Sequence, residues 1–141
     1  MLQRLLRRTL VLQNIIEQMS SKLRLAIQKS GRLSEDSIKL LKDCGIDLRN
    51  VKDRLKTESD NFPLEIFFLR DDDIPEYVSD GVADIGIVGE NVVYEKNKQV
   101  EVVEKLGFGK CRLCFAVDKS IDYSKDYLQN KRIATSYPVL V

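Results

Sequence analysis

Apolar runs of strand length alternate along the chain with stretches in which apolar residues recur at helical spacing. This alternation is the feature that most restricts the fold that the chain can adopt. The runs lie at Lys22–Ile27, Leu64–Arg70 and Ala83–Val88. Because the second run is almost continuously apolar, we expect a strand covered on both faces. Strands that alternate with helices predict an α/β fold with a mostly parallel sheet.

Helix start and stop residues stand between these runs. Ser34, followed by two acidic residues, is expected to cap a helix that Gly45 ends. Asp73 is expected to cap a second helix, with a proline in its first turn and Gly81 at its end. A third helix is expected to begin at Glu90.

Further elements are expected elsewhere along the chain. Residues 47–61 predict a short exposed strand and a loop. Residues 100–106, 110–117 and 131–135 are strand candidates, and a short helix is expected near 123–129. Since the chain stops where another helix should follow, it is expected to be cut short.

The sequence is expected to divide into three parts. Residues 1–22 form a basic amphipathic extension, residues 23–106 a first, incomplete α/β lobe, and residues 107–141 the start of a second, truncated lobe. The extension resembles a targeting, surface-lying or partner-binding helix. The favoured interpretation is an upstream start codon, with Met19 close to the original beginning.

Composition excludes several classes of function. A net charge of +1 favours neither nucleic acid nor an anionic membrane as a partner. Cys111 and Cys114 form a CxxC motif, but a chain with no histidine and no second such motif lacks the ligands of a zinc site. We therefore expect two ordinary packed thiols and no metal site. The absence of histidine also removes the usual general base.

Polar residues collect where the expected strands end. Ligands of open α/β sheets bind beyond the carboxyl ends of the strands. Each loop alone is explained as a turn, a cap or a local ion pair, but their joint position at one edge favours a site. Cations and backbone N–H groups in two of the loops suit phosphate. The four groups are Gln28, Lys29, Ser30, Gly31 and Arg32; Arg70 with Asp71, Asp72 and Asp73; Gly89, Glu90 and Asn91; and Thr135, Ser136 and Tyr137.

Four segments of the chain stand in a distinctive order and spacing: "LRLAIQKSGRLSEDSIKLLKDCGI", "RDDDIPEYVSDGVADIGIVGEN", "LGFGKCRLCFAV" and "KRIATSYPVL". Together they resemble the N-terminal half of the long-form ATP phosphoribosyltransferases, which catalyse the first step of histidine biosynthesis. The resemblance runs from about Leu23 to the end of the chain. It implies two lobes like those of type II periplasmic binding proteins, with the active site in the cleft. It also implies a cytoplasmic homo-oligomer that acts on ATP and 5-phosphoribosyl 1-diphosphate (PRPP), with Mg²⁺ arriving on the phosphates.

The resemblance also assigns roles to residues. Adenine N1 attacks the anomeric carbon of PRPP as pyrophosphate leaves, so the reaction depends on positioning and charge compensation. Arg54 and Arg70 are the implied catalytic arginines, which stabilise the leaving pyrophosphate or the triphosphate. The nucleotide is expected along Gln28, Lys29, Ser30, Gly31 and Arg32, and its ribose or base near Gly89, Glu90 and Asn91. The expected supporting residues are Asp71, Asp72 and Asp73, which cap a helix and orient Arg70, and Tyr137.

Two departures from the family pattern qualify the expected activity. The PRPP-binding run, an acidic residue followed by Ser/Thr-Gly-x-Thr, is absent from the sequence, as is the regulatory domain that binds histidine. We therefore expect weak or no catalysis from this chain alone. The alternative is a non-catalytic module that binds an adenine nucleotide or regulates a partner. A solute receptor of the same fold is a third possibility, which the missing export leader disfavours.

Overall fold

The computed structural model describes residues 22–49, 55–124 and 128–141. Its centre is a four-stranded sheet of order β2-β3-β1-β4. Strand β1 pairs in parallel with β3 and β4, and β2 pairs antiparallel with β3. The expected α/β class with a mostly parallel sheet is therefore confirmed. The strands are β1 (Leu23–Gln28), β2 (Lys56–Glu58), β3 (Leu64–Leu69) and β4 (Ile85–Ile87), and the helices are α2 (Arg32–Asp43), the 3-10 helix η1 (Asp71–Asp73), α3 (Ile74–Ser79) and α4 (Glu90–Lys96).

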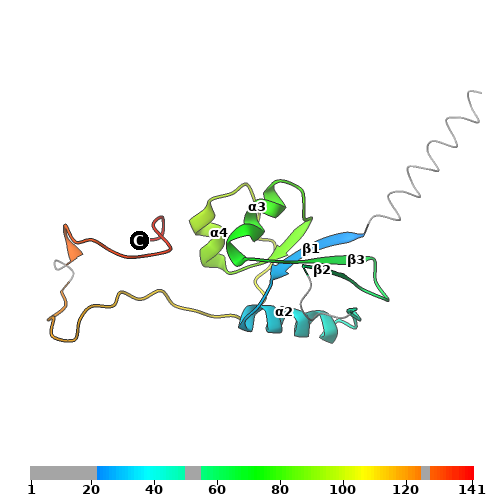
Figure 1. Cartoon of the computed structure of the whole chain (residues 1–141), viewed down its shortest axis with the longest axis horizontal. Helices are drawn as coiled ribbons and strands as arrows, with labels where there is room; N and C mark the ends of the chain where they lie inside the picture. The colour runs from blue at the N-terminus through cyan, green and yellow to red at the C-terminus, as the bar shows by residue number, and fades with distance from the viewer. Residues whose placement is uncertain (1–21, 50–54, 125–127) are drawn as a thin grey trace, which may run out of the picture.

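Helices cover both faces of this sheet, with α2 on one side and α3 and α4 on the other (Figure 1). Neighbouring residues of β3 divide between two apolar clusters: Ile66 packs towards α2 and Phe67 towards α3. The expectation that this strand is covered on both faces is therefore confirmed. The cluster beneath α2 contains Leu25, Ile27, Leu41, Leu64, Ile66 and Phe68, and the opposite cluster is built on Ala26, Ile74 and Ala83.

Helix α2 begins three residues earlier than the serine suggested. Gly31 is the residue before the helix, and Ser34 lies within the first turn, 4% exposed. The expectation that Ser34 caps the helix is therefore wrong, because packing draws the serine inside. The expected end is confirmed: the N–H groups of Gly45 and Ile46 bond back to the last turn at 2.8 and 3.0 Å, as in a Schellman motif.

The three aspartates form the short 3-10 helix η1 ahead of α3. The side chain of Asp73 makes no capping hydrogen bond, because its backbone is already helical at φ −87° and ψ −21°. The expected cap is therefore wrong. Asp72 lies 3.5 Å from Lys96. The N–H group of Asp73 donates to the carbonyl oxygen of Arg70 at 3.1 Å, but within the part of the chain that the structure describes no aspartate side chain of η1 bonds to the Arg70 side chain. Gly81, at φ +69°, ends α3 as expected.

Residues 100–106, 110–117 and 131–135 form no strand in the structure. Alternation supplies the propensity for a strand, but a strand exists only beside a partner whose N–H and C=O groups it can bond. Large apolar side chains remain exposed there, including Val103 (70%) and Leu113 (54%). The expected helix near 123–129 lies partly outside the described residues.

The end of the chain returns to α4. The N–H groups of Val139 and Leu140 donate to the carboxylate of Glu95 at 3.0 to 3.1 Å. Across the ranges that the structure describes, no helix has the length and apolarity needed to cross a membrane.

Candidate functional site

Three of the four polar loops lie at one edge of the sheet. Gln28 of β1 stands opposite Leu69 of β3, and Ile27 stands opposite Ile87 of β4. Because these strands are parallel, their carboxyl ends are neighbours, and the loops that follow them leave from the same edge. These loops are residues 28–32, 70–73 and 89–91.

The first two loops are joined through the backbone. The N–H group of Lys29 donates to the carbonyl oxygen of Leu69 at 2.7 Å, which extends the ladder between β1 and β3 by one bond. Lys29 and Arg70 therefore leave adjacent strands at the same level, and both are exposed.

The first loop leads into the open end of α2. Gly31 has φ +90° and ψ 179°, a conformation that side-chain-bearing residues avoid. No side chain caps this 12-residue helix, so the N–H groups of its first turn lack a side-chain partner. Such an end attracts anions. Arg32, the first helical residue, adds an exposed cation there.

Three cations of this edge have no acidic partner. Within the described ranges, Lys29, Arg32 and Arg70 take part in no ion pair or side-chain hydrogen bond. Asp71 and Asp73 are likewise without a side-chain partner there. Arg54 lies outside the described residues.

Glu90, expected near the ribose or base, has a partner that sequence reasoning missed. The ammonium group of Lys105 lies 2.8 Å from the Glu90 carboxylate, and the Tyr94 hydroxyl donates to it at 3.4 Å. The bond from Lys105 lowers the pKa of Glu90. No local signal could have revealed this pair, since the two residues are 15 positions apart and residues 100–106 were expected in a strand.

The side chain of Asn91 folds over Gly89. A Cβ atom added to Gly89 would lie 2.5 Å from the Asn91 amide oxygen. The φ of −64° at Gly89 suits any residue, and the Asn91 amide stands at the end of a flexible side chain that can move, so neither feature requires glycine at position 89. Asn91 is half-buried beside the end of β4.

The fourth loop does not follow a strand. Tyr137 is half-buried in the returning segment, and its N–H group donates to the Thr135 hydroxyl oxygen at 2.9 Å. The expected position after a strand is wrong, because residues 131–135 have no strand to pair with. This segment bonds to α4 through the N–H group of Val139, which donates to the Glu95 carboxylate.

The thiols are not packed. Cys44, Cys111 and Cys114 are free and exposed. The expectation of two packed thiols at 111 and 114 is therefore wrong, because the strand that would have buried them does not form. Among the described residues, no group of three or more histidine, cysteine, aspartate or glutamate side chains could hold a metal ion.

The family model described as "HisG: ATP phosphoribosyltransferase" matches residues 70–141, about half of the 141-residue chain. An ATP phosphoribosyltransferase of Cytophaga hutchinsonii is 61% identical over 121 residues, which are 85% of this chain and 42% of that protein. One from Bacteroides thetaiotaomicron is 49% identical over 120 residues, 84% of this chain and 42% of that protein. The chain thus spans about 42% of the length of these curated relatives.

The chain is also similar to a solved structure, the ATP phosphoribosyl transferase (HisG:HisZ) complex from Thermotoga maritima. It is 34% identical, with a TM-score of 0.48, and the match covers 56% of this chain and 37% of that one. The family model covers half of the chain, which is enough to establish the family to which the chain belongs. The chain belongs to the ATP phosphoribosyltransferase family.

Proposed function

We propose that this chain supplies the nucleotide-binding half of an ATP phosphoribosyltransferase, which joins ATP and PRPP to give phosphoribosyl-ATP and pyrophosphate in histidine biosynthesis. One observation carries the proposal. Lys29, Arg32 and Arg70 stand without partners, among the described residues, at the sheet edge where the open N-terminus of α2 also lies. Unpaired cations beside open backbone N–H groups suit a polyphosphate.

The proposed roles follow from this arrangement and from family membership. Arg54 and Arg70 offset the charge that develops on the leaving pyrophosphate. Asn91, whose side chain lies over Gly89, is available to the ribose or the base. The Glu90 carboxylate, which is bonded to Lys105, is assigned to the same ribose or base. The first loop follows the phosphates. Asp71, Asp72 and Asp73 support the site only through the backbone of η1, where the Asp73 N–H group donates to the Arg70 carbonyl oxygen at 3.1 Å, and Tyr137 is assigned a supporting role.

Mg²⁺ enters this proposal as part of the substrate. The described residues form no carboxylate cluster able to hold a resident ion. ATP and PRPP carry Mg²⁺ on their own phosphates, and the cationic loops bind the phosphate oxygens that the metal leaves free. We place the reaction in the cytoplasm of the cell and in a homo-oligomer, as family membership suggests.

A second candidate is a non-catalytic module. The unpaired, exposed Lys29, Arg32 and Arg70 suit the binding of an adenine nucleotide whether or not transfer follows. We assign residues 23–106 to a first lobe and residues 107–141 to the start of a second. On this assignment we expect weak or no turnover from the chain alone.

Calorimetric titration of the full chain with ATP and MgCl₂ tests the site. Arg32→Gln and Arg70→Gln should each weaken binding about tenfold, as expected for the loss of a charge-assisted hydrogen bond. Arg49→Gln is the matched control, because Arg49 is paired with Asp60 at the opposite edge. Unchanged affinity in both site variants would refute the assignment.

A second measurement separates the two candidates. The chain is mixed with ATP, PRPP and Mg²⁺, and the ultraviolet absorbance change of phosphoribosyl-ATP is followed. Turnover that Arg70→Gln abolishes supports the transferase. Nucleotide binding with no turnover supports the non-catalytic module.

A further inference from the structure

The CxxC motif of Cys111 and Cys114 has no part in the proposed nucleotide site. Both thiols are free and exposed. Residues 110–117, which contain them, take part in no hydrogen bond or ion pair with a described residue. Two thiols therefore stand three positions apart on a backbone that can change its local conformation without breaking a described bond.

The extended conformation keeps these thiols apart. Figure 1 shows the chain passing the end of α2 and then running away from the sheet as an extended trace. An extended backbone rises about 3.3 Å per residue, so three steps separate the two Cα atoms by about 10 Å. A disulfide requires Cα atoms within about 7 Å of each other, a separation that a four-residue turn provides. The extended form and a disulfide between Cys111 and Cys114 are therefore mutually exclusive states of the segment.

The charges beside the thiols favour an anionic reactant. Residues 110–117 contain two cations, Lys110 and Arg112, and no acidic residue. Both cations are exposed, and neither is paired with a described residue. Positive charge of this kind raises the local concentration of small anions. Glutathione disulfide, which carries carboxylates beside its sulfur–sulfur bond, is a reactant of this class.

We propose that Cys111 and Cys114 form a reversible disulfide by exchange with a small anionic disulfide of the glutathione class. The thiolate of one cysteine attacks a sulfur of the small disulfide, which releases one reduced thiol and leaves a mixed disulfide. The thiolate of the other cysteine attacks the protein sulfur of that mixed disulfide, and a second reduced thiol leaves. The chain gives up two electrons and two protons, which the small disulfide takes up. In the cytoplasm, where we place the reaction, protein disulfides are transient and sense the redox state.

The redox state of the motif sets one wall of the cavity beside β4. This cavity has a volume of about 1640 Å³, and residues 84–88 and 110–113 are part of its lining. Arg112 and Leu113 lie between the two cysteines, so the turn that the disulfide imposes moves both side chains from their places in the wall. The reduced segment completes this wall, and the oxidised segment opens it.

Glutathione buffers of increasing disulfide content test the exchange on the full chain. After free thiols are blocked with iodoacetamide, mass spectrometry should find a chain that has lost two hydrogen atoms and keeps one of its three thiols. Peptide mapping should place the bond between Cys111 and Cys114, and dithiothreitol should restore all the thiols. Three free thiols at the highest disulfide content, glutathione adducts that persist on both cysteines, or a bond that includes Cys44 would overturn the proposal.

Serine variants give the matched controls. Cys44→Ser should leave the bond unchanged, whereas Cys114→Ser should stop at a glutathione adduct on Cys111. All three cysteines are exposed, so circular dichroism should report an unchanged fold. Hydrogen exchange at residues 85–87 should be faster in the oxidised native chain than in the reduced one, and the same buffers should not alter it in the double variant Cys111→Ser/Cys114→Ser. Equal exchange in the two redox states would refute the movement of the wall.

Discussion

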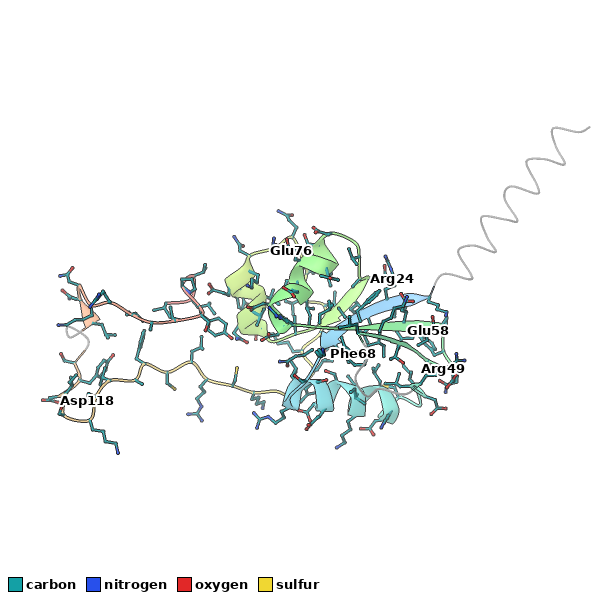
Figure 2. All side chains as sticks on the ribbon, viewed as in Figure 1. Arg24, Arg49, Glu58, Phe68, Glu76 and Asp118 are labelled. Carbon is teal, nitrogen blue, oxygen red and sulfur yellow. The ribbon has the colours of Figure 1, made fainter. Side chains whose placement is uncertain are left out.

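The two edges of the parallel sheet differ in whether their cationic side chains are paired with acidic ones. At the amino-terminal edge, three cations are bonded to acidic side chains, and the labelled Arg24, Arg49 and Glu58 lie towards that end of the sheet (Figure 2). At the carboxyl-terminal edge, Lys29, Arg32 and Arg70 are exposed and have no such partner among the described residues. The amino-terminal pairs are Lys22–Glu58 at 2.7 Å, Arg24–Asp84 at 2.6 Å and Arg49–Asp60.

This difference separates stability from binding. At one edge, the Arg24 side chain donates twice to the Asp84 carboxylate, at 2.6 and 3.1 Å, and the Arg24 N–H group donates once more at 2.8 Å. These bonds fasten β4 to β1. Lys29, Arg32 and Arg70 at the other edge bond to no described side chain, so they remain available to a ligand. Substitutions should therefore affect stability at the first edge and binding at the second.

Gly31→Ala should give the largest loss of stability. Because Gly31 lies at the carboxyl-terminal edge, this substitution is an exception to the rule that only the amino-terminal edge affects stability. An added Cβ would meet no atom within 4 Å, so the cost is the strain of φ +90° alone, about 1–3 kcal/mol in the free energy of unfolding. Urea denaturation followed by circular dichroism measures it. Ser30→Ala, at an exposed neighbour, is the control, and equal stability of the two variants would show that the strain is absorbed.

Asp84→Asn should give the next largest loss. The variant keeps the shape of the side chain but removes the charge that Arg24 binds, and we expect a decrease of about 1 kcal/mol or less, since the pair is partly exposed. The affinity for ATP should not change. Asp122→Asn, at an exposed position, is the control. A loss of ATP affinity in Asp84→Asn would contradict the separation of the two edges.

Acid should remove the same contribution. The hydrogen bonds from Arg24 hold the pKa of Asp84 below its ordinary value of 3.8. The stabilisation is therefore fully present above that value and is lost as the pH falls through the lower pKa of the folded chain. Melting temperatures of the native chain and Asp84→Asn, measured from pH 7 to pH 3, should converge at the acid end. A constant difference between them would exclude this linkage.

Arg32→Gln and Arg70→Gln should have the smallest effect on stability. Each side chain is exposed and has no described partner, so the free energy of unfolding should stay within about 0.5 kcal/mol of the native chain. The same urea titrations measure it beside the ATP affinities. A loss above about 1 kcal/mol would mean that these cations hold the fold, and the contrast between the edges would fail.

Sequence reasoning was most reliable where local pattern and burial agree. The strand expected at Leu64–Arg70 forms at Leu64–Leu69, because its side chains meet helices on both faces. Gly45 and Gly81 end their helices as expected, since each has a positive φ that glycine tolerates. These features depend on a few neighbouring residues and on whether they are buried.

Prediction from the sequence failed where the structure of a segment depends on distant parts of the chain. Residues 110–117 have the alternation of a strand but no partner in the structure, so they stay exposed. Asp73 has the chemistry of a cap, but η1 already places its backbone in the helix. The position of the three loops at one edge could be predicted, because each loop follows a strand of the expected parallel sheet. The pair of Glu90 with Lys105 could not be predicted, because no rule of spacing connects the two residues.

The contact of Glu95 with the end of the chain has an entropic consequence. It joins residues 45 positions apart, and closing a flexible loop of that length costs about 3 kcal/mol. The bonds to Val139 and Leu140 converge on this one carboxylate, so a single side chain opposes much of the entropy that the intervening chain would regain on release. The position of the last residues therefore depends on one side chain of α4, Glu95.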